Sequence, residues 1–209
     1  NAEKIETDQL INELKNVDGI LIPGGFGYRG VEGKIQAIKF ARENDIPFFG
    51  ICLGMQLSVI EISRNLMGKQ DSNSTEFKTS NNPVVSLMTE WNNENKTEKR
   101  DLTSDKGGTM RLGSYRAVLK KGSKIHNIYN SDEISERHRH RYEVDLSYTK
   151  DFEQKGFHFS GMSPDNILPE VIESVNHKWF IGVQFHPELK SRPLAPHPLF
   201  SSFIKHCIK

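Results

Sequence analysis

Pro47-Phe48-Phe49-Gly50-Ile51-Cys52-Leu53-Gly54-Met55-Gln56 joins a short apolar run to a helical pattern through a turn of small residues. The apolar run, residues 46–51, predicts a buried strand, and apolar residues then recur at helical spacing at Leu53, Leu57 and Ile60. The turn between them reads Gly-x-Cys-x-Gly, the cysteine counterpart of the Gly-x-Ser-x-Gly nucleophile elbow. This strand–turn–helix unit predicts an α/β fold that presents Cys52 as a reactive side chain.

Two properties of the turn favour a catalytic role for Cys52. Glycines on both sides avoid the clash that side chains would cause in a tight strand-to-helix turn. The helix that follows aims its unpaired N–H groups and positive dipole end at the sulfur, so we expect a lowered thiol pKa and a reactive thiolate. The alternative is a small buried apolar residue with a packing role. We prefer that alternative for Cys207, which lies on the apolar stripe of the closing helical pattern, residues 199–208.

Composition excludes several classes of protein. The 209 residues suffice for one α/β domain with a substantial core. A formal net charge of +1 argues against nucleic-acid binding driven by bulk charge, and no apolar run approaches the roughly 18 residues of a membrane span. Only two cysteines occur and no secretory signal is visible. We therefore expect a cytoplasmic protein in a reducing compartment, without a membrane or nucleic-acid partner.

The rest of the pattern alternates between helices and strands. Helices are predicted over residues 7–16, with Thr7 as N-cap and Asp8 in the first turn, over 33–44, over 53–68 and at the C-terminus. Strands are predicted over 18–23, 46–51, 84–88, 116–119, 135–144, 157–159, 171–175 and 179–185. Residues 92–105 are strongly polar and predict a poorly ordered insertion.

The last apolar strand delivers His186-Pro187-Glu188. In an extended segment, residues i and i+2 point the same way, so the carboxylate of Glu188 can hold the imidazole of His186 in one tautomer. A surface pair is the alternative for so short a motif. Together with Cys52 at the end of another strand, the two residues complete a Cys–His–Glu triad of nucleophile, base and orienting carboxylate.

Glycines dominate the loop Gly24-Gly25-Phe26-Gly27-Tyr28-Arg29-Gly30. Its last six residues match Gly-x-Gly-x-x-Gly, so a dinucleotide-binding fold is a rival interpretation, with Glu43 or Asp45 as the ribose-binding acid. A Pro-Gly pair at the strand end is unusual for that fold, and no good helix follows the last glycine immediately. We interpret the loop as an oxyanion site instead, in which the N–H groups of Gly25 and Leu53 bind a developing negative charge.

An amino-acid substrate carries one cation and one anion, so its pocket needs one carboxylate and one guanidinium. Glu76, after the elbow helix, and Arg141, at the end of a basic strand, could supply them, and a solvated surface charge is the alternative for each. Residues 137–141 alternate arginine and histidine, which could suggest nucleic acid or a metal. His138 and His140 lack further ligands of matching spacing, so we expect no metal site.

Three of these segments together resemble the class I (triad) glutamine amidotransferases: residues 23–27 (PGGFG), 50–56 (GICLGMQ) and 185–188 (FHPE). Four longer segments narrow the resemblance to the CTP synthase family. They are residues 25–34 (GFGYRGVEGK), 73–77 (NSTEF), 107–113 (GGTMRLG) and 136–144 (ERHRHRYEV). These motifs span nearly the whole chain.

The resemblance implies a three-layer α/β fold with a mostly parallel central sheet, helices on both faces and a nucleophile elbow. It implies a glutaminase whose catalytic residues are Cys52, His186 and Glu188. The site for L-glutamine would be lined by Gly25, Leu53, Gly54, Met55, Gln56, Glu76 and Arg141. The ammonia would aminate UTP to CTP in an N-terminal amidoligase domain of the same polypeptide, which uses ATP and Mg²⁺, while the glutaminase domain itself needs no cofactor. GTP is the family's allosteric activator, with Arg29 as a candidate contact, and the full enzyme is expected to be a homotetramer.

Because the chain begins with Asn1 rather than Met, we expect it to be cut from a longer polypeptide. By the resemblance, residues 1–209 form the glutaminase domain without the family's first strand and helix, and the amidoligase domain is absent. Two other functions stay open at this point. One is the amidotransferase domain of a different biosynthetic enzyme or a free γ-glutamyl hydrolase, and the other is a catalytically silent binding module.

Overall fold

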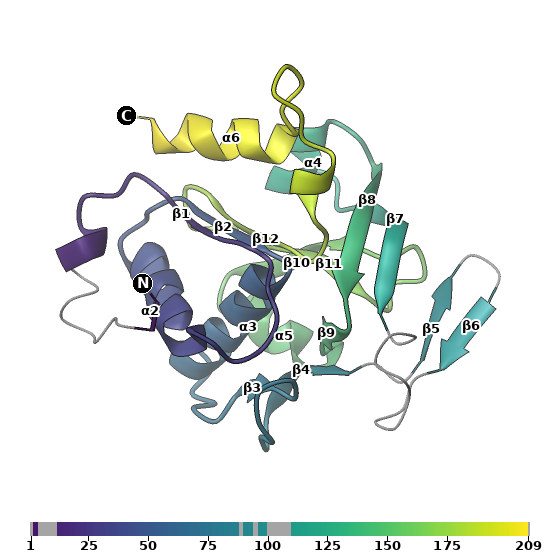
Figure 1. The fold of residues 1–209 in the computed structure, drawn as a ribbon, viewed down its shortest axis with the longest axis horizontal. Helices are drawn as coiled ribbons and strands as arrows, with labels where there is room; N and C mark the ends of the chain where they lie inside the picture. Colours follow the sequence, from purple (N-terminus) through teal and green to yellow (C-terminus); the bar gives the residue numbers. More distant parts are fainter. Residues whose placement is uncertain (1, 4–11, 88–89, 94–95, 100–109, 209) are drawn as a thin grey trace.

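The computed structural model describes residues 2–3, 12–87, 90–93, 96–99 and 110–208 (Figure 1). Its centre is a seven-stranded sheet with the spatial order β1-β2-β12-β11-β10-β7-β8. The strands are β1 (Ile20–Ile22), β2 (Phe48–Ile51), β12 (Phe180–Val183), β11 (Pro169–Ser174), β10 (Phe157–Met162), β7 (Arg111–Leu119) and β8 (Glu133–His140). Strands from distant parts of the chain, β2 and β12, therefore lie side by side.

The strands β1, β2 and β12 run parallel and form the part of the sheet that carries the predicted site. Ile22 pairs with Gly50, and Gly50 pairs in turn with Gly182. Consecutive side chains of a strand point to opposite faces, so Phe48 packs in one core and Phe49 in another. Because the three strands are parallel, their carboxyl ends lie at the same edge of the sheet.

The strands β11, β10, β7 and β8 continue the sheet with antiparallel pairings. Residues 163–168 and 175–179, which join β10 to β11 and β11 to β12, are too short for the crossover that a parallel pair requires. The predicted α/β fold is confirmed, and its sheet is mixed. The expected parallel arrangement describes the end of the sheet that carries the site.

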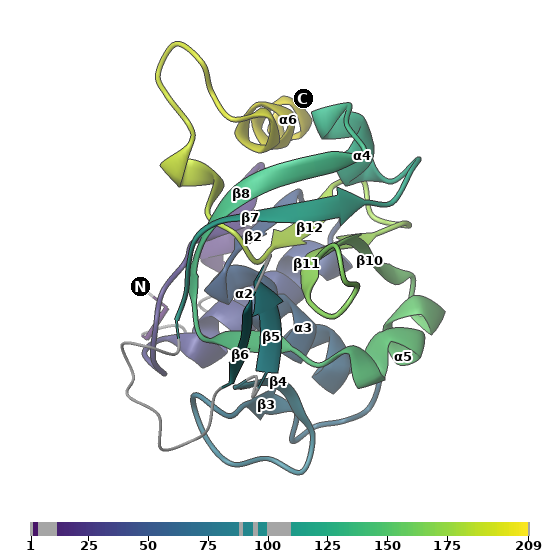
Figure 2. The same ribbon diagram turned by 90° about the vertical axis from the view of Figure 1, so that its right-hand side faces the viewer.

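Helices cover both faces of the sheet, as the resemblance implied (Figures 1 and 2). The helices α2 (Val31–Glu43), α3 (Leu53–Asn65) and α5 (Thr149–Gln154) lie on one face, and α4 (Lys124–Tyr129) and α6 (Pro198–Cys207) on the other. The helix α3 is buried on nearly every side from Leu53 to Ser63, as expected of a helix enclosed by other elements. Its buried carboxylate, Glu61, accepts hydrogen bonds of 2.8–3.1 Å from Arg42 of α2.

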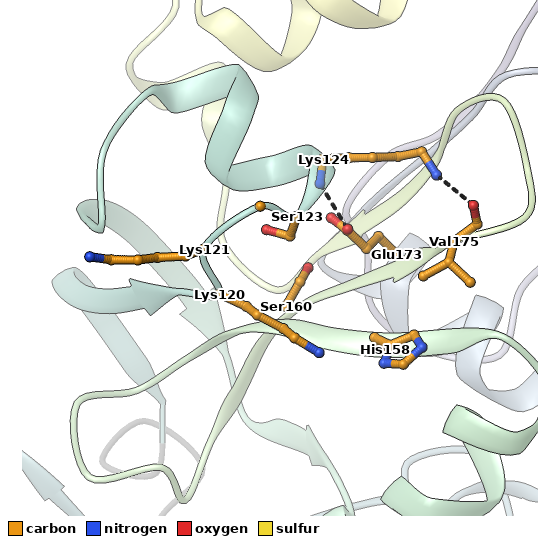
Figure 3. Close-up of a pocket in the computed structure, with 9 residues that line it drawn as sticks. Lys120, Lys121, Ser123, Lys124, His158, Ser160, Glu173 and Val175 are labelled. Carbon is orange, nitrogen blue, oxygen red and sulfur yellow. Dashed lines mark hydrogen bonds between the residues drawn. The ribbon is translucent and has the colours of Figure 1, made fainter.

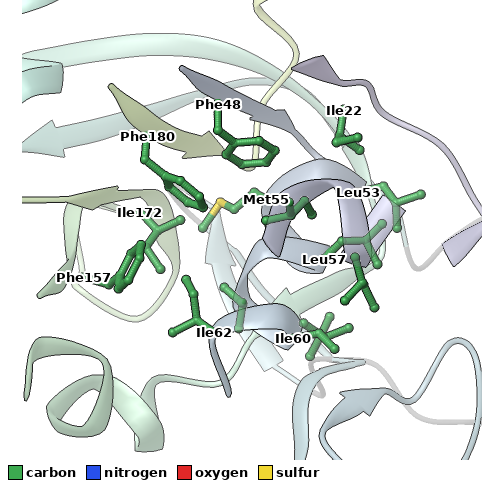
Figure 4. Close-up of a cluster of buried hydrophobic side chains, with 14 of the residues drawn as sticks. Ile22, Phe48, Leu53, Met55, Leu57, Ile60, Ile62, Phe157, Ile172 and Phe180 are labelled. Atoms are coloured by element: carbon green, nitrogen blue, oxygen red, sulfur yellow. The ribbon is translucent and has the colours of Figure 1, made fainter. Parts of the chain in front are cut away.

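Two apolar cores hold β2 and β12 from opposite faces. In the larger one, Met55 of α3 lies against the rings of Phe48 and Phe180, whose centroids are 4.4 Å apart (Figure 4). In the other, Trp179 packs on Phe203 of α6 at 5.3 Å. Such burial contributes about 1.5–3 kcal/mol for each large side chain. The strand ends that carry the site are therefore fixed by packing on both sides.

Two smaller sheets complete the described structure. The strands β3 (Asn73–Ser74), β4 (Pro83–Leu87) and β9 (Tyr142–Val144) form one of them, and the hairpin β5 (Glu90–Asn93) with β6 (Lys96–Lys99) forms the other. Residues 92–93 and 96–99, which belong to the segment predicted to be poorly ordered, are thus strands, while 94–95 and 100–105 lie outside the described residues. Short 3-10 turns, η1 (Leu146–Tyr148) and η2 (Pro187–Leu189), follow β9 and β12.

Some expectations need correction or are not covered. Residues 7–11 of the predicted first helix, with Thr7 and Asp8, lie outside the described residues, as do residues 107–109. The apolar stripe predicted over residues 199–208 is narrower than expected, because Ile204 of α6 and Ile208, just beyond its end, are 55% and 72% exposed. In the described part of the chain, no helix combines the length and apolarity that crossing a bilayer requires.

Candidate active site

The ends of β1, β2 and β12 meet at one edge of the sheet, where they lead into the glycine loop, Cys52 and the segment of His186. The backbone N–H of Cys52 donates to the carbonyl of Val183 at 2.7 Å, which ties β2 to the end of β12. The N–H of His186 donates to the carbonyl of Arg137 in β8, also at 2.7 Å. The sheet therefore brings together residues that lie 134 positions apart in the sequence, 52 and 186.

Cys52 occupies a strained turn between β2 and α3. Its φ of 51° and ψ of −101° lie outside the regions that L-residues usually occupy, and such strain is concentrated at functional sites. A Cβ added at Gly50 would lie 2.7 Å from the carbonyl carbon of Gly54, and one added at Gly54 would collide with the carbonyl oxygen of Ile22. Both contacts are with backbone atoms, so close packing requires the two glycines of the Gly-x-Cys-x-Gly motif.

His186 and Glu188 form a hydrogen-bonded pair, with Nδ1 of the imidazole 2.6 Å from Oε1 of the carboxylate. The extended geometry predicted for this motif is wrong, because residues after His186 turn into η2 and bring the carboxylate back to the ring. Burial alone would raise the pKa of Glu188, but the hydrogen bond from His186, a backbone hydrogen bond and the nearby imidazoles together outweigh it and leave that pKa lowered. Nε2 of His186 is buried without a hydrogen-bond partner among the described residues. It is the ring nitrogen available to take a proton.

Gly24 leaves open the space in which the cysteine and histidine side chains approach each other. A Cβ at this position would lie 2.7 Å from Cε1 of His186 and 3.6 Å from Cβ of Cys52. Both side chains thus come within 4 Å of one point beside the glycine loop. This proximity suits proton transfer between the sulfur and the imidazole, because catalytic contacts of a resting site are often looser than those with substrate bound.

Comparisons with known proteins agree with this geometry. The family described as glutamine amidotransferase class-I matches residues 1–206, nearly the whole chain. The chain belongs to this family. The amidotransferase is 55% identical over 209 residues to CTP synthase of Paramagnetospirillum magneticum, and 61% identical over 205 residues to that of Bradyrhizobium diazoefficiens. These matches cover 100% and 98% of the chain but 39% and 38% of the two relatives, so the chain spans about two fifths of their length.

Similarity to solved structures agrees with membership of the class-I glutamine amidotransferase family. It is similar to the glutaminase domain of Trypanosoma brucei CTPS with bound acivicin, with a TM-score of 0.87 and 38% identity over 99% of this chain and 78% of that one. It shares its fold with a glutamine amidotransferase of Thermotoga maritima, at a TM-score of 0.52 and 18% identity, over 84% and 58% of the two chains.

These matches decide against the dinucleotide-binding fold considered for the glycine loop. The absence of a helix after the glycine loop was a wrong argument against that fold, since α2 begins at Val31, directly after Gly30.

The thiol of this amidotransferase is protonated at rest, contrary to the prediction of a lowered pKa. Cys52 is only 2% exposed, and burial raises the pKa of its thiol to about 12. A hydrogen bond from the backbone N–H of Leu53 acts in the opposite direction but is outweighed. The helix N-terminus therefore does not suffice to ionise the sulfur. A base such as His186 has to take the proton as the sulfur attacks.

Glu76 and Arg141, expected to bind the two charged ends of an amino acid, are brought together beside the glycine loop. Oε1 of Glu76 accepts a hydrogen bond of 2.7 Å from the N–H of Gly27. Burial raises the pKa of Glu76, and the charge of Arg141 acts against that rise. Glu76 also acts on the pKa of Cys52, so it lies within electrostatic reach of the sulfur. This arrangement favours a binding site over two independent surface charges.

The other residues expected at the glutamine site differ in where their side chains lie. Leu53 packs against the glycine loop, 3.2 Å from where a Cβ of Gly25 would be. Met55 points into the core (Figure 4). The amide nitrogen of Gln56, which is 3% exposed, donates to the carbonyl of Tyr142 at 2.9 Å and faces another side-chain amide at 3.2 Å. Contacts of Met55 or Gln56 with glutamine would therefore have to come from the backbone.

Gln184 belongs to the site and was missed in the sequence. It is fully buried just after β12, and its Nε2 lies 3.8 Å from Sγ of Cys52. A signal was present, because a glutamine inside the apolar run of residues 179–185 is unexpected unless it has a buried partner. The steric role of Gly24 was missed too, since it depends on a side chain 162 positions away, at residue 186.

A surface pocket of about 300 Å³ lies away from these residues, between α4 and the strands β10 and β11 (Figure 3). Its Glu173 accepts a hydrogen bond from the backbone N–H of Lys124 at 2.9 Å, and Nζ of Lys124 lies 3.4 Å from the carbonyl of Val175. None of the residues predicted for the active site lines this pocket.

The two histidines considered as metal ligands, His138 and His140, are hydrogen-bonded to each other at 2.9 Å. Over the described ranges, no three His, Cys, Asp or Glu side chains gather as a metal site would need.

Proposed function

We propose that the chain is the glutaminase part of a CTP synthase, which hydrolyses L-glutamine so that the ammonia can aminate UTP to CTP in the same enzyme. The observation that carries the proposal is the meeting of Cys52 with the hydrogen-bonded pair of His186 and Glu188 at the ends of two adjacent parallel strands. Identities of 55% and 61% to CTP synthases support it, as does the similarity to a CTPS glutaminase domain with bound acivicin.

The reaction starts from the neutral thiol. Nε2 of His186 takes the proton as Sγ of Cys52 attacks the side-chain amide carbon of glutamine, and Glu188 stabilises the imidazolium that forms. The imidazolium then gives its proton to the leaving nitrogen, so ammonia departs and a γ-glutamyl thioester remains on the sulfur. Water, deprotonated by the same nitrogen, adds to the thioester. Glutamate leaves, and the proton returns to the sulfur.

The glycine loop and its neighbours bind the substrate in this proposal. The N–H groups of Gly25 and Leu53 stabilise the oxyanion of each tetrahedral intermediate, and removal of one such donor typically costs about 3 kcal/mol of transition-state stabilisation. The carboxylate of Glu76 receives the α-ammonium group of glutamine, and the guanidinium of Arg141 receives its α-carboxylate. The backbone of Gly54, Met55 and Gln56 completes the pocket.

The rest of the enzyme is proposed from its relatives. An N-terminal amidoligase domain would use ATP and Mg²⁺ to activate UTP, and the full enzyme would be a homotetramer in the cytoplasm. GTP would act as the activator near the glycine loop. Arg29 of that loop is 82% exposed and holds Glu3 through Nε and Nη2 at 2.7 and 2.9 Å. A contact between Arg29 and a phosphate would therefore replace the pairing with Glu3.

The experiment is CTP formation by the full-length protein from two nitrogen sources. Cys52→Ala should abolish CTP formation from glutamine and leave the reaction with ammonium intact, because free ammonia bypasses the thiol. Loss of both activities would indicate a structural role for Cys52, and loss of neither would refute its role as nucleophile. A wild-type protein that hydrolyses glutamine but does not aminate UTP with ATP would belong to a different amidotransferase or hydrolase.

A further inference from the structure

We propose that Gln184 is a positioning residue for the nucleophile. Gln56 fixes the orientation of the Gln184 side-chain amide, so that an N–H group of Gln184 always faces the sulfur of Cys52. The inference rests on the proposed function, since it assumes that this sulfur attacks the substrate. The three side chains come from different elements: Cys52 from the turn after β2, Gln56 from α3, and Gln184 from the residue after β12.

The side chains of Cys52, Gln184 and Gln56 form a continuous chain of buried contacts, here called the relay, which ends at the carbonyl of Tyr142. Nε2 of Gln184 lies 3.8 Å from Sγ of Cys52, and Oε1 of Gln184 lies 3.2 Å from Nε2 of Gln56. The same Nε2 of Gln56 lies 2.9 Å from the carbonyl oxygen of Tyr142 at the start of β9. Gln56 and Gln184 are 3% and 0% exposed. Water does not reach these amides, so each depends on protein partners.

The orientation of the two amides in the relay follows from the carbonyl of Tyr142 at its end. The two ends of a glutamine amide have nearly the same shape, so their orientation has to be deduced from their partners. The carbonyl of Tyr142 can only accept, so the group of Gln56 that faces it must be the NH₂. The second hydrogen of that NH₂ points to Gln184, which must therefore present its oxygen. The NH₂ group of Gln184 is then left to face the sulfur.

A donor held at the sulfur favours its ionised form. The carboxylates of Glu143, Glu188 and Glu76 lie close enough to oppose ionisation of Cys52, and the imidazole of His186 approaches the cysteine beside Gly24. The amide of Gln184 offsets part of that opposition without adding a charge that would compete with His186. Gln184 and His186 stand two residues apart on the chain, so one strand end supplies both the donor and the base.

The test is the rate at which iodoacetamide modifies Cys52 in the full-length protein, followed across pH by mass spectrometry of the Cys52 peptide. Gln184→Met keeps the length of the side chain and removes the donor. A hydrogen bond to a charged group is worth enough that we expect modification to be about ten- to a hundredfold slower at each pH below the thiol pKa. Cys207 of the same sample serves as an internal standard whose rate should not change.

Two further variants separate this effect from loss of folding. Gln56→Met/Gln184→Met replaces both amides by apolar side chains of similar size. The carbonyl of Tyr142 keeps a ring nitrogen of His140 at 3.3 Å, so the fold should be preserved. Gln154→Met, at the exposed end of α5, is the matched control for the same change of side chain. Its Cys52 should react at the wild-type rate.

Slower modification of Cys52 in either relay variant, with a near-native Tm, supports the proposal. If Gln184→Met does not fold, the double variant gives the answer. An unchanged rate for Cys52 in the relay variants that fold would overturn it, because a merely structural glutamine leaves the ionisation of the sulfur alone. The reaction with iodoacetamide reports on the sulfur whatever the natural substrate is, so failure of the proposed glutaminase function would show separately, in the Cys52→Ala experiment.

Discussion

Substitution of Gly24 by alanine tests whether the glycine loop leaves room for His186 to reach Cys52. The added Cβ would lie 2.7 Å from Cε1 of His186, against an ordinary contact distance of 3.4 Å or more, so the ring has to move by about 0.7 Å. The backbone of His186 is held by its 2.7 Å hydrogen bond to Arg137. The ring rather than the chain must therefore turn, and this disturbs its 2.6 Å contact with Glu188. A displacement of about 1 Å at a catalytic group can cost about 100-fold in rate.

We expect the glutaminase kcat/KM of full-length Gly24→Ala to fall by about 100-fold. Its Tm should change little, because the φ of Gly24 lies outside the left-handed region. Gly68→Ala is the matched control, since Gly68 has a φ of +72° and no atom lies within 4 Å of an added Cβ. It should lose about 1 kcal/mol of stability and keep its activity. A folded Gly24→Ala protein with wild-type kcat/KM would refute the position assigned to His186.

Three further outcomes are expected. Because the side chain of Met55 lies in the core, Met55→Ala should lower the free energy of unfolding in urea by about 2–5 kcal/mol. For the same reason Met55→Leu should leave the KM for glutamine unchanged, and a raised KM would place this side chain in the substrate site. Arg42→Met leaves the carboxylate of Glu61 buried without its guanidinium and should cost about 3–5 kcal/mol near pH 8. Burial raises the pKa of Glu61, so protonation relieves this cost as pH falls through that raised pKa, and equal losses near pH 8 and pH 5 would contradict the explanation. Modification of wild-type Cys52 by iodoacetamide should still accelerate above pH 9.0, the ordinary thiol pKa, because burial raises the pKa of this thiol to about 12; a plateau near neutral pH would mean a resting thiolate.

The parts of the site that were predictable from the sequence are those that short-range sterics determine. Gly50 and Gly54 had to be glycines because backbone atoms pass directly over them, and this requirement is readable from Gly-x-Cys-x-Gly. The strand before the turn and the helix after it begin and end close to the predicted residues. The meeting of Cys52 with His186 followed from two strands that end at the same edge of a parallel sheet.

The parts that were not predictable depend on packing across the whole chain. The pKa of Cys52 was predicted from the nearby helix end, but it is determined by the burial that β12 and the glycine loop impose. The helical spacing of α3 does not tell which side of a helix buried all round faces the site, so it could not predict that the side chain of Met55 lies in the core. The turn at Pro187 had a local signal, since proline favours the first position of a helical turn. The antiparallel half of the sheet was determined by the lengths of the loops after β10 and β11.

A covalent intermediate can be sought by rapid acid quenching of the full-length protein with isotopically labelled glutamine, followed by mass spectrometry of its peptides. The mechanism predicts a γ-glutamyl group on the Cys52 peptide within one turnover, and none in the Cys52→Ala protein. Glutamine hydrolysis at the wild-type rate with no label on Cys52, or with label on another residue, would contradict it.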